Sequence, residues 1–231
     1  MAPMNINDRV KEFFEHHQLV VYKKGETIVR AEDTPEYAYY VEDGFIRQYA
    51  LSYEGEELTL NIYRPGSYFS ISWLLGQEKN DYFFETLDTS QVRRARLADV
   101  RSLLLSDYEV LKDVTRRITV GLQASLLLTQ AIAFGNARQK VSAVLVLMSR
   151  RFGVWQGNTV TIIFPLTHRL LATMLGLARE TTSLEISGLR KDGILKTANS
   201  HMMVTDYRRL VADSGLTMLG DLPSRQVVDS P

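Results

Sequence analysis

The residues best suited to recognise a partner chemically are a neighbouring arginine and glutamate, Arg179 and Glu180, at the start of a predicted helix. An arginine can donate two parallel hydrogen bonds to O6 and N7 of guanine, and a glutamate can accept one from the amino group of cytosine. Each such contact discriminates against a wrong base by about 1–3 kcal/mol. On an ordinary surface helix the same two side chains would only be a solvated ion pair, so their role depends on the elements that position them.

Residues 166–194 predict two short helices joined by a tight turn. Thr167 is a typical N-cap, with apolar residues at helical spacing after it, and Gly176 can adopt the left-handed backbone that ends a helix. A second helix is then expected from about residue 178, with a buried stripe of Thr182, Ile186 and Leu189. Its outer face holds the candidate base-reading residues, which are Arg179, Glu180, Ser183 and Leu184, together with Ser187.

The segments around these two helices complete a winged helix-turn-helix. A helix over 137–152 and a strand over 159–164 precede them, and two short strands around Asn199 and Ser200 follow, before a helix over 207–213. We therefore expect a DNA-binding domain over residues 136–219. Residues 220–231 are expected to form a loosely ordered tail.

The first hundred residues have a different pattern, which predicts an all-β module. Short β-type runs between residues 19 and 97 alternate with glycine turns such as 24–26 and 42–44. Such spacing is typical of a small antiparallel barrel or jelly roll. The expected fold class is α+β, with an antiparallel β-roll sensor over residues 1–106, a long helix over 107–135 and the winged domain after it.

The long helix predicts a dimer interface. Alternating steps of three and four residues, the spacing of a coiled-coil seam, connect Leu111, Val114, Ile118, Gly121, Ser125, Leu128 and Ile132. The alternative is a helix packed on its own β-module, a use of one face that Leu122, Leu126 and Leu127 favour. Both uses can occur together. Gly135 and Asn136 interrupt the helical pattern and are expected to form a hinge.

Composition narrows the class of protein. The 231 residues carry no net charge, but residues 1–135 have 15 basic and 20 acidic side chains, a net −5, and residues 136–231 have 12 and 7, a net +5. A basic C-terminal part is what phosphate contact requires. The absence of cysteine excludes disulfides, thiolate zinc sites and a cysteine-ligated iron–sulfur cluster, and the four histidines show no metal-ligand spacing. We expect no membrane span and no signal peptide, and hence a cytoplasmic protein.

With these elements in order, the chain resembles the Crp/Fnr family of bacterial transcription regulators over nearly its whole length. The resemblance lies mainly in Leu166-Thr167, Leu171-Ala172, Gly176, Arg179-Glu180-Thr181, Leu189 and Gly193-Ile194, and less specifically in Tyr39-Tyr40-Val41, Gly44 and Pro65-Gly66. It implies a homodimeric, non-catalytic regulator that binds a near-palindromic site in double-stranded DNA, with RNA polymerase as a further candidate partner. It also implies that Arg179 and Glu180 read a guanine-containing half-site, and that the phosphate contacts come from Thr167, His168 and Thr181.

Two departures from the family pattern affect specificity. Leu184 stands where the family commonly has a further arginine, and an aliphatic side chain can touch a thymine methyl but cannot bond to guanine. In the segment that holds the ribose and phosphate in cyclic-nucleotide-binding members, Ile71 stands near the glutamate position and Tyr82-Phe83 near the Arg-Ser position. A phosphate without its guanidinium would be poorly held, so cyclic AMP is not the expected effector.

The signal itself stays open at this point. A candidate effector pocket for a less polar ligand is formed by Tyr68, Phe69, Ile71, Tyr82 and Phe83, although the same side chains could simply fill the barrel. Haem held by a histidine is a further alternative. Two other functions are considered: a constitutive DNA-binding regulator whose β-roll has lost its ligand, and, more remotely, a cupin-like enzyme. The absence of a clustered His/Glu metal set in residues 19–97 argues against the enzyme.

Overall fold

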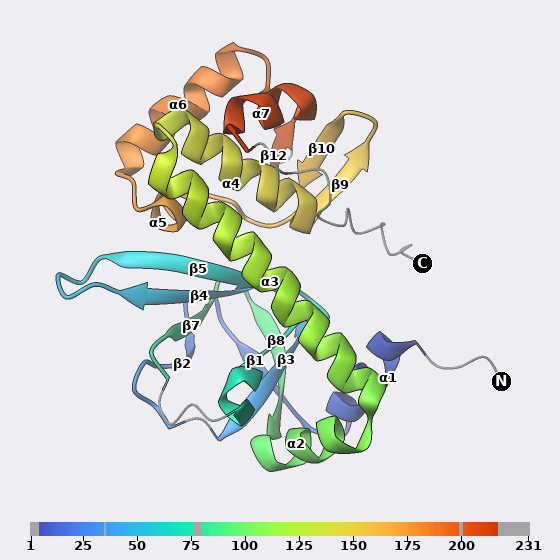
Figure 1. Cartoon of the computed structure of the whole chain (residues 1–231). Coiled ribbons are helices and arrows are strands. Elements are labelled where there is room, and N and C mark those ends of the chain that lie inside the picture. The colour runs from blue at the N-terminus through green and yellow to red at the C-terminus, as the bar shows by residue number, and fades with distance from the viewer. Residues whose placement is uncertain (1–4, 35, 76–79, 199–200, 217–231) are drawn as a thin grey trace. The chain divides into compact units, whose positions relative to one another are not determined.

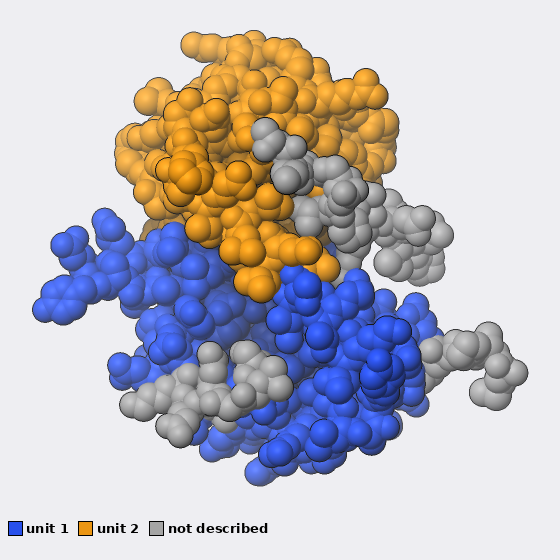
Figure 2. Space-filling view, in the orientation of Figure 1, with its two compact units in different colours: residues 1–119 blue, residues 120–231 orange. Residues whose placement is uncertain are grey.

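A computed structural model of the chain describes residues 5–34, 36–75, 80–198 and 201–216 (Figure 1). The chain divides into two compact units, residues 1–119 and 120–231 (Figure 2). The division falls inside the long helix rather than at either of its predicted ends. The predicted tail, 220–231, lies outside the described residues.

Unit 1 contains the predicted antiparallel β-roll, built from two four-stranded sheets. One sheet has the order β1-β8-β3-β6, with strands Gln18–Tyr22, Ser90–Arg96, Tyr37–Asp43 and Tyr68–Phe69. The other has the order β2-β7-β4-β5, with strands Thr27–Val29, Phe83–Thr86, Ile46–Leu51 and Glu57–Tyr63. Neighbouring strands pair antiparallel in both sheets. All eight strands lie within or next to the range 19–97 that the sequence predicts to be β, although β6, β7 and β8 were not located individually.

The turn between β3 and β4 shows why glycine is needed there. Gly44 has φ +84, and a Cβ at this position would lie 2.3 Å from Ser90 Oγ and 2.8 Å from Asp88 Oδ1. The Asp88 carboxylate accepts a hydrogen bond from the backbone N–H of Phe45 at 2.8 Å. Any larger residue would therefore disturb the contact between this turn and the loop before β8.

Helices cover the roll. They are α1 (Ile6–Glu15), a 3-10 turn η1 (Ile71–Leu75), α2 (Leu97–Ser106) and the first part of α3 (Tyr108–Phe134). The sequence pattern did not predict α1, which begins at the N-cap Asn5 and buries Phe14 against Tyr40, with the ring centroids 5.3 Å apart. The Asp107 carboxylate begins α3 by accepting hydrogen bonds from the backbone N–H groups of Glu109 and Val110.

The predicted seam on α3 needs correction. Val114 is 5% exposed and belongs to the core of the β-roll, so it cannot face a partner. Leu122 and Leu126 are 58% and 59% exposed, whereas Leu127, which the alternative also named, is half-buried. With about 100° between successive residues, the apolar face that stays exposed is rotated from the predicted one and consists of Leu111, Ile118, Leu122 and Leu126.

The composition of α3 beyond its first turns is unusual. No charged residue occurs from Ile118 to Phe134, and the helix is long and apolar enough to cross a membrane by length and composition alone. The expectation of no membrane span therefore cannot rest on the lack of a helix of this length and composition. The polar residues in the stretch are uncharged Thr, Ser and Gln, spaced between aliphatic side chains.

Unit 2 contains the winged helix-turn-helix. After the end of α3 come α4 (Ala137–Phe152), β9 (Gly153–Gln156), β10 (Thr159–Ile162), α5 (His168–Leu175), α6 (Arg179–Lys191), β11 (Leu195–Ala198), β12 (His201–Val204) and α7 (Tyr207–Ser214). The sequence pattern missed β9, which completes a four-stranded sheet of order β11-β12-β10-β9. At the interruption after α3, Asn136 caps α4 in a capping box with Gln139. Residues 141–149 of α4 are all buried, so this helix forms the centre of the domain.

Candidate nucleic-acid interface

The first helix of the motif, α5, begins and ends where the sequence predicted. The Thr167 hydroxyl accepts a hydrogen bond from the backbone N–H of Leu170 at 3.1 Å. Gly176 has φ 59, the left-handed backbone that ends a helix without a Cβ penalty. Leu171 and Leu175 are buried between these ends. The cap at Thr167, the left-handed backbone at Gly176 and the burial of the two leucines therefore all help to fix the turn that leads to α6.

The second helix, α6, presents a sharply divided surface. Its predicted stripe of Thr182, Ile186 and Leu189 is completely buried. Glu180 lies in its first turn and Arg190 and Lys191 in its last, an arrangement that complements the helix dipole. The face away from the stripe is consequently presented to solvent by packing alone.

Arg179 and Glu180 are exposed at the start of that face. Neither side chain forms a hydrogen bond or ion pair with any residue that the structure describes. Leu184, one turn further on, is 72% exposed, a high value for a leucine in a small domain. These three side chains thus have donor, acceptor and apolar capacity that the chain itself does not use.

Two predicted contact residues are bonded to each other instead. Nδ1 of His168, the first residue of α5, lies 3.0 Å from Oγ of Ser183 on α6, and both side chains are half-buried. Burial, and then the positive charges of Arg190 and Arg179, lower the pKa of His168 from its usual 6.5. The other predicted phosphate contacts, Thr167 and Thr181, are exposed and half-buried respectively.

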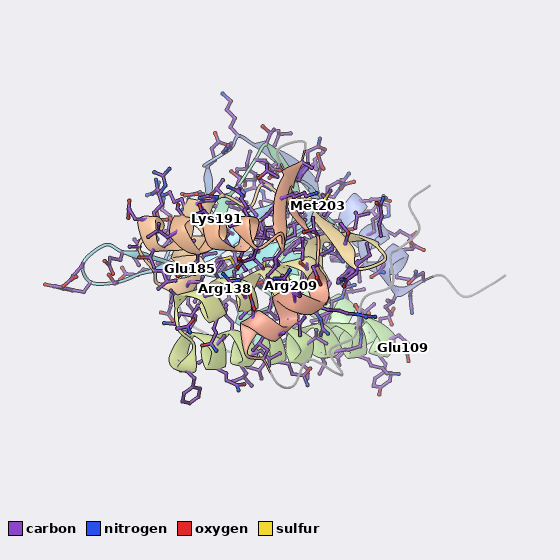
Figure 3. All side chains as sticks on the ribbon, turned by 90° about the horizontal axis from the view of Figure 1, so that it is seen from above. Glu109, Arg138, Glu185, Lys191, Met203 and Arg209 are labelled. Atoms are coloured by element: carbon purple, nitrogen blue, oxygen red, sulfur yellow. The ribbon has the colours of Figure 1, made fainter. Side chains whose placement is uncertain are left out.

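Polar contacts that sequence spacing did not reveal hold the C-terminal end of α6. The Arg138 side chain, on α4, is labelled in Figure 3. Its guanidinium contacts the carboxylates of Asp192 and Asp213 at 2.6 Å each. Hydrogen bonding to Asp213, and secondarily to Asp192, raises the pKa of Arg138. Arg209 of α7 donates to the carbonyl oxygen of Asp192 at 3.0 Å. The C-terminal end of α6, away from Arg179, is thus anchored to α4 and α7.

The hairpin formed by β11 and β12 is also joined to α6. Nη2 of Arg190 donates to the Thr197 hydroxyl on β11 at 2.9 Å. Exposed basic side chains lie on α6 and on the elements next to it, namely Arg169, Arg190, Lys191 and Lys196. This is the charge that contact with a phosphate backbone requires.

The candidate effector residues in the β-roll do not come together as one group. Phe69 and Tyr82 belong to one apolar cluster, while Tyr68 and Ile71 pack in a second cluster with α1, α2 and α3. Phe83 stacks on Tyr49, with the ring centroids 5.1 Å apart. Successive strand residues point to opposite faces, which separates Tyr68 from Phe69 although they are neighbours in the sequence.

Inside the first of these clusters the aromatic rings pack on one another. Phe69 stacks between Tyr39 and Phe84, with ring centroids 4.9 Å apart on each side. Tyr63 and Trp73 add further contacts to Phe84. Burial raises the pKa of Tyr39 to about 12. Of the candidate pocket residues, Phe69 and Ile71 are core residues, whereas Tyr68, Tyr82 and Phe83 are half-buried.

Comparison with known proteins agrees with this architecture. A family model of the cyclic nucleotide-binding domain matches residues 19–107, and one of the Crp-like helix-turn-helix domain matches residues 139–212. Transcriptional regulator SdrP of Thermus thermophilus is 28% identical over 173 residues, which cover 75% of this chain and 81% of that protein.

Solved structures agree as well. A transcriptional regulator of the CRP/FNR family from Thermus thermophilus has a TM-score of 0.67 at 25% identity, with 85% of this chain and 98% of that chain covered. FixK2 from Bradyrhizobium japonicum shares the fold, with a TM-score of 0.74 at 22% identity and coverage of 85% and 96%. The relatives are transcription regulators and not enzymes. Because the two domain models together cover most of the chain, the chain belongs to the Crp/Fnr family of DNA-binding transcription regulators.

Proposed function

We propose that this regulator binds near-palindromic DNA as a homodimer, with Arg179 and Glu180 reading bases in each half-site. The observation that carries the proposal is the exposed Arg-Glu pair without partners among the described residues, on the outer face of α6. In a helix-turn-helix the first residues of the second helix meet the base edges in the major groove. Arg179 would bond to guanine and Glu180 to the cytosine of a neighbouring pair.

Leu184 is proposed to read the next position through a thymine methyl group. It is exposed one turn beyond Glu180 on the same face, and it has no polar atom with which to bond to guanine. We therefore expect a thymine preference, or a weak preference, where an arginine would impose guanine.

The proposed phosphate contacts flank this reading face. Thr167 and His168 lie at the start of α5 and Thr181 lies in the first turn of α6, while the basic side chains of the domain supply the long-range attraction. Affinity for DNA should consequently fall steeply as salt is raised.

Dimerisation is proposed to use the exposed apolar face of α3. Leu111, Ile118, Leu122 and Leu126 recur at steps of seven and four residues along one side of the helix. Pairing two copies would remove this face from water and present two reading helices one turn of DNA apart, about 34 Å. A regulator that reads the chromosome acts in the cytoplasm, where RNA polymerase is its proposed further partner.

For the signal, the packing of the roll favours an effector other than cyclic AMP or none. The aromatic stack of Tyr39, Phe69 and Phe84 occupies the interior of the roll with the chain's own side chains. The second candidate, a constitutive regulator whose β-roll has lost its ligand and only stabilises the dimer, is supported by the same stack.

Binding-site selection from random DNA with the purified full-length protein tests these proposals. We expect an inverted repeat with a guanine opposite each Arg179 and no guanine requirement opposite Leu184. Repeating the selection with cyclic AMP and with a metabolite extract separates the two candidates, because the constitutive regulator would select the same sites with the same affinity. Recovery of no sequence motif, with an affinity that does not depend on salt, would refute DNA reading by this face.

A further inference from the structure

The contact between His168 and Ser183 joins two residues that sequence reasoning assigned to different tasks. Nδ1 of His168 and Oγ of Ser183 are 3.0 Å apart, although the residues lie fifteen positions apart on α5 and α6. We propose that Ser183 does not read a base but fixes the tautomer of His168, so that Nε2 of the imidazole donates a hydrogen bond to a DNA phosphate. The inference rests on the proposed function and adds a positioning residue to it.

The hydroxyl groups of α6 indicate the direction of this hydrogen bond. Thr182 and Ser187 donate their hydroxyl protons to the carbonyl oxygens of Ala178 and Ser183, four residues earlier, at 3.1 and 2.8 Å. Ser183 makes no such bond within the described part of the chain, where its hydroxyl contacts His168. Its proton is therefore free to be donated to Nδ1.

The charge state of the ring decides what the other nitrogen can do. Burial and the neighbouring guanidinium groups of Arg190 and Arg179, both on α6, lower the pKa of His168. The imidazole is therefore neutral at neutral pH and carries a single N–H. When Nδ1 accepts from Ser183, that N–H is at Nε2, and the ring becomes a neutral donor at the start of α5, next to the exposed Thr167.

This arrangement suits a phosphate better than a base. The surroundings of the ring are positive, through Arg179 and Arg190 and through the N-terminal end of α5, so an anionic acceptor is favoured. A phosphate contact is the same for every sequence, whereas a base contact is not. Loss of the Ser183 hydroxyl should thus weaken binding to all DNA sequences by the same factor.

The first test needs no DNA. Long-range nitrogen–proton NMR spectra of uniformly ¹⁵N-labelled protein at pH 7.5 report the tautomer of each histidine, and His168→Gln identifies the signal among the four. We expect the Nε2–H tautomer in the wild type and in Ser183→Thr, which keeps the hydroxyl, and a mixture in Ser183→Ala. An Nδ1–H tautomer in the wild type, or no change in Ser183→Ala, would overturn the proposal while leaving the DNA-binding function untouched.

The second test measures affinity for the selected site and for single-base variants of it. Ser183→Ala should weaken binding about fivefold on every sequence, the effect of one hydrogen bond. The control is Ser102→Ala, an exposed serine of α2 whose hydroxyl bonds to the carbonyl oxygen of Ala98, and it should leave binding unchanged. In a His168→Gln background, Ser183→Ala should have no further effect. A loss confined to one base pair would mean that Ser183 reads that base, and a full additive loss in the double variant would show that it acts without His168.

Discussion

Two arginines, one in each unit, are surrounded in opposite ways. Arg47 on β4 is 8% exposed, and its guanidinium contacts Glu57 at 2.7 Å and Glu85 at 3.0 Å and lies 4.2 Å from the centre of the Tyr49 ring. Arg179 on α6 is exposed and, among the described residues, has no such partner. All three guanidinium nitrogens of Arg47 thus contact a carboxylate, whereas Arg179 has no polar partner among the residues that the structure describes.

The same contrast holds for the larger regions around them. In the β-roll, aromatic side chains that could have recognised a ligand pack on each other, as Phe69 does between Tyr39 and Phe84. In the helix-turn-helix, packing buries one stripe of α6 and leaves Arg179, Glu180 and Leu184 exposed on the outer face. Exposed side chains whose capacity for hydrogen bonds or apolar contacts is not used by other described residues therefore indicate the functional surface better than residue type alone.

Removing a ring from the aromatic stack should have the largest effect on stability. Phe69→Ala deletes a side chain that is 2% exposed and leaves a cavity between two rings, which should cost about 4 kcal/mol in the free energy of unfolding. Urea unfolding measures this cost. Tyr53→Ala, at a fully exposed position, is the control and should stay within about 0.5 kcal/mol. A small effect of Phe69→Ala would mean that the roll interior is loosely packed and open to a ligand.

Arg47→Ala should destabilise the protein by about 3 kcal/mol, because it leaves Glu57 and Glu85 without their cation in a half-buried site. The measurement is again urea unfolding, with the exposed Arg101→Ala as the matched control. Affinity of the folded variant for DNA should remain unchanged. If Arg47→Ala and Arg101→Ala cost the same, the contrast between paired and unpaired arginines would not hold.

Arg179→Ala should show the reverse pattern. We expect a loss of about 2 kcal/mol of discrimination per half-site, measured as the ratio of affinities for the selected site and for a site with the guanine replaced. The free energy of unfolding should change by less than about 0.5 kcal/mol, because the side chain has no partner to lose among the described residues. A drop of several kcal/mol in stability would make Arg179 a structural residue.

The smallest expected effect concerns pH. The folded state lowers the pKa of His168 below its unfolded value of 6.5, so the unfolded chain takes up the proton more readily. His168 should therefore make its full contribution to stability above pH 6.5 and lose it as the pH falls below that value. Unfolding curves at pH 7.5 and 5.5 should differ more for the wild type than for His168→Gln. An equal difference for the two proteins would show that the ring is not perturbed.

Local signals in the sequence predicted the recognition motif well. Thr167, Gly176 and the stripe of α6 act through neighbours within a few residues, and the structure has them as expected. The predictions for α3 were less accurate, because periodicity gives a helix face but not the surface it packs against. Only the fold decides that Val114 enters the core while Leu122 stays exposed.

Contacts between distant residues were beyond sequence reasoning. Arg138 meets Asp192 and Asp213 across 54 and 75 positions, and no spacing rule connects such residues. The short strands β6 and β7 were missed for a related reason. With two and four residues, they are too short for an alternating pattern and depend on pairing with strands elsewhere in the chain.

The uncharged stretch of α3 from Ile118 to Phe134 has a consequence for how the regulator responds to ionic strength. The part of an interface made by this stretch would contain no ion pairs between the two helices for dissolved ions to weaken, whereas contact with DNA releases counterions and is opposed by salt. Assembly and DNA binding should therefore separate on a salt gradient, with the dimer intact at concentrations that strip it from DNA. The stretch from Ile118 to Phe134 has no charges with which to reject a related chain, so partner choice along it would depend on the fit of its uncharged side chains.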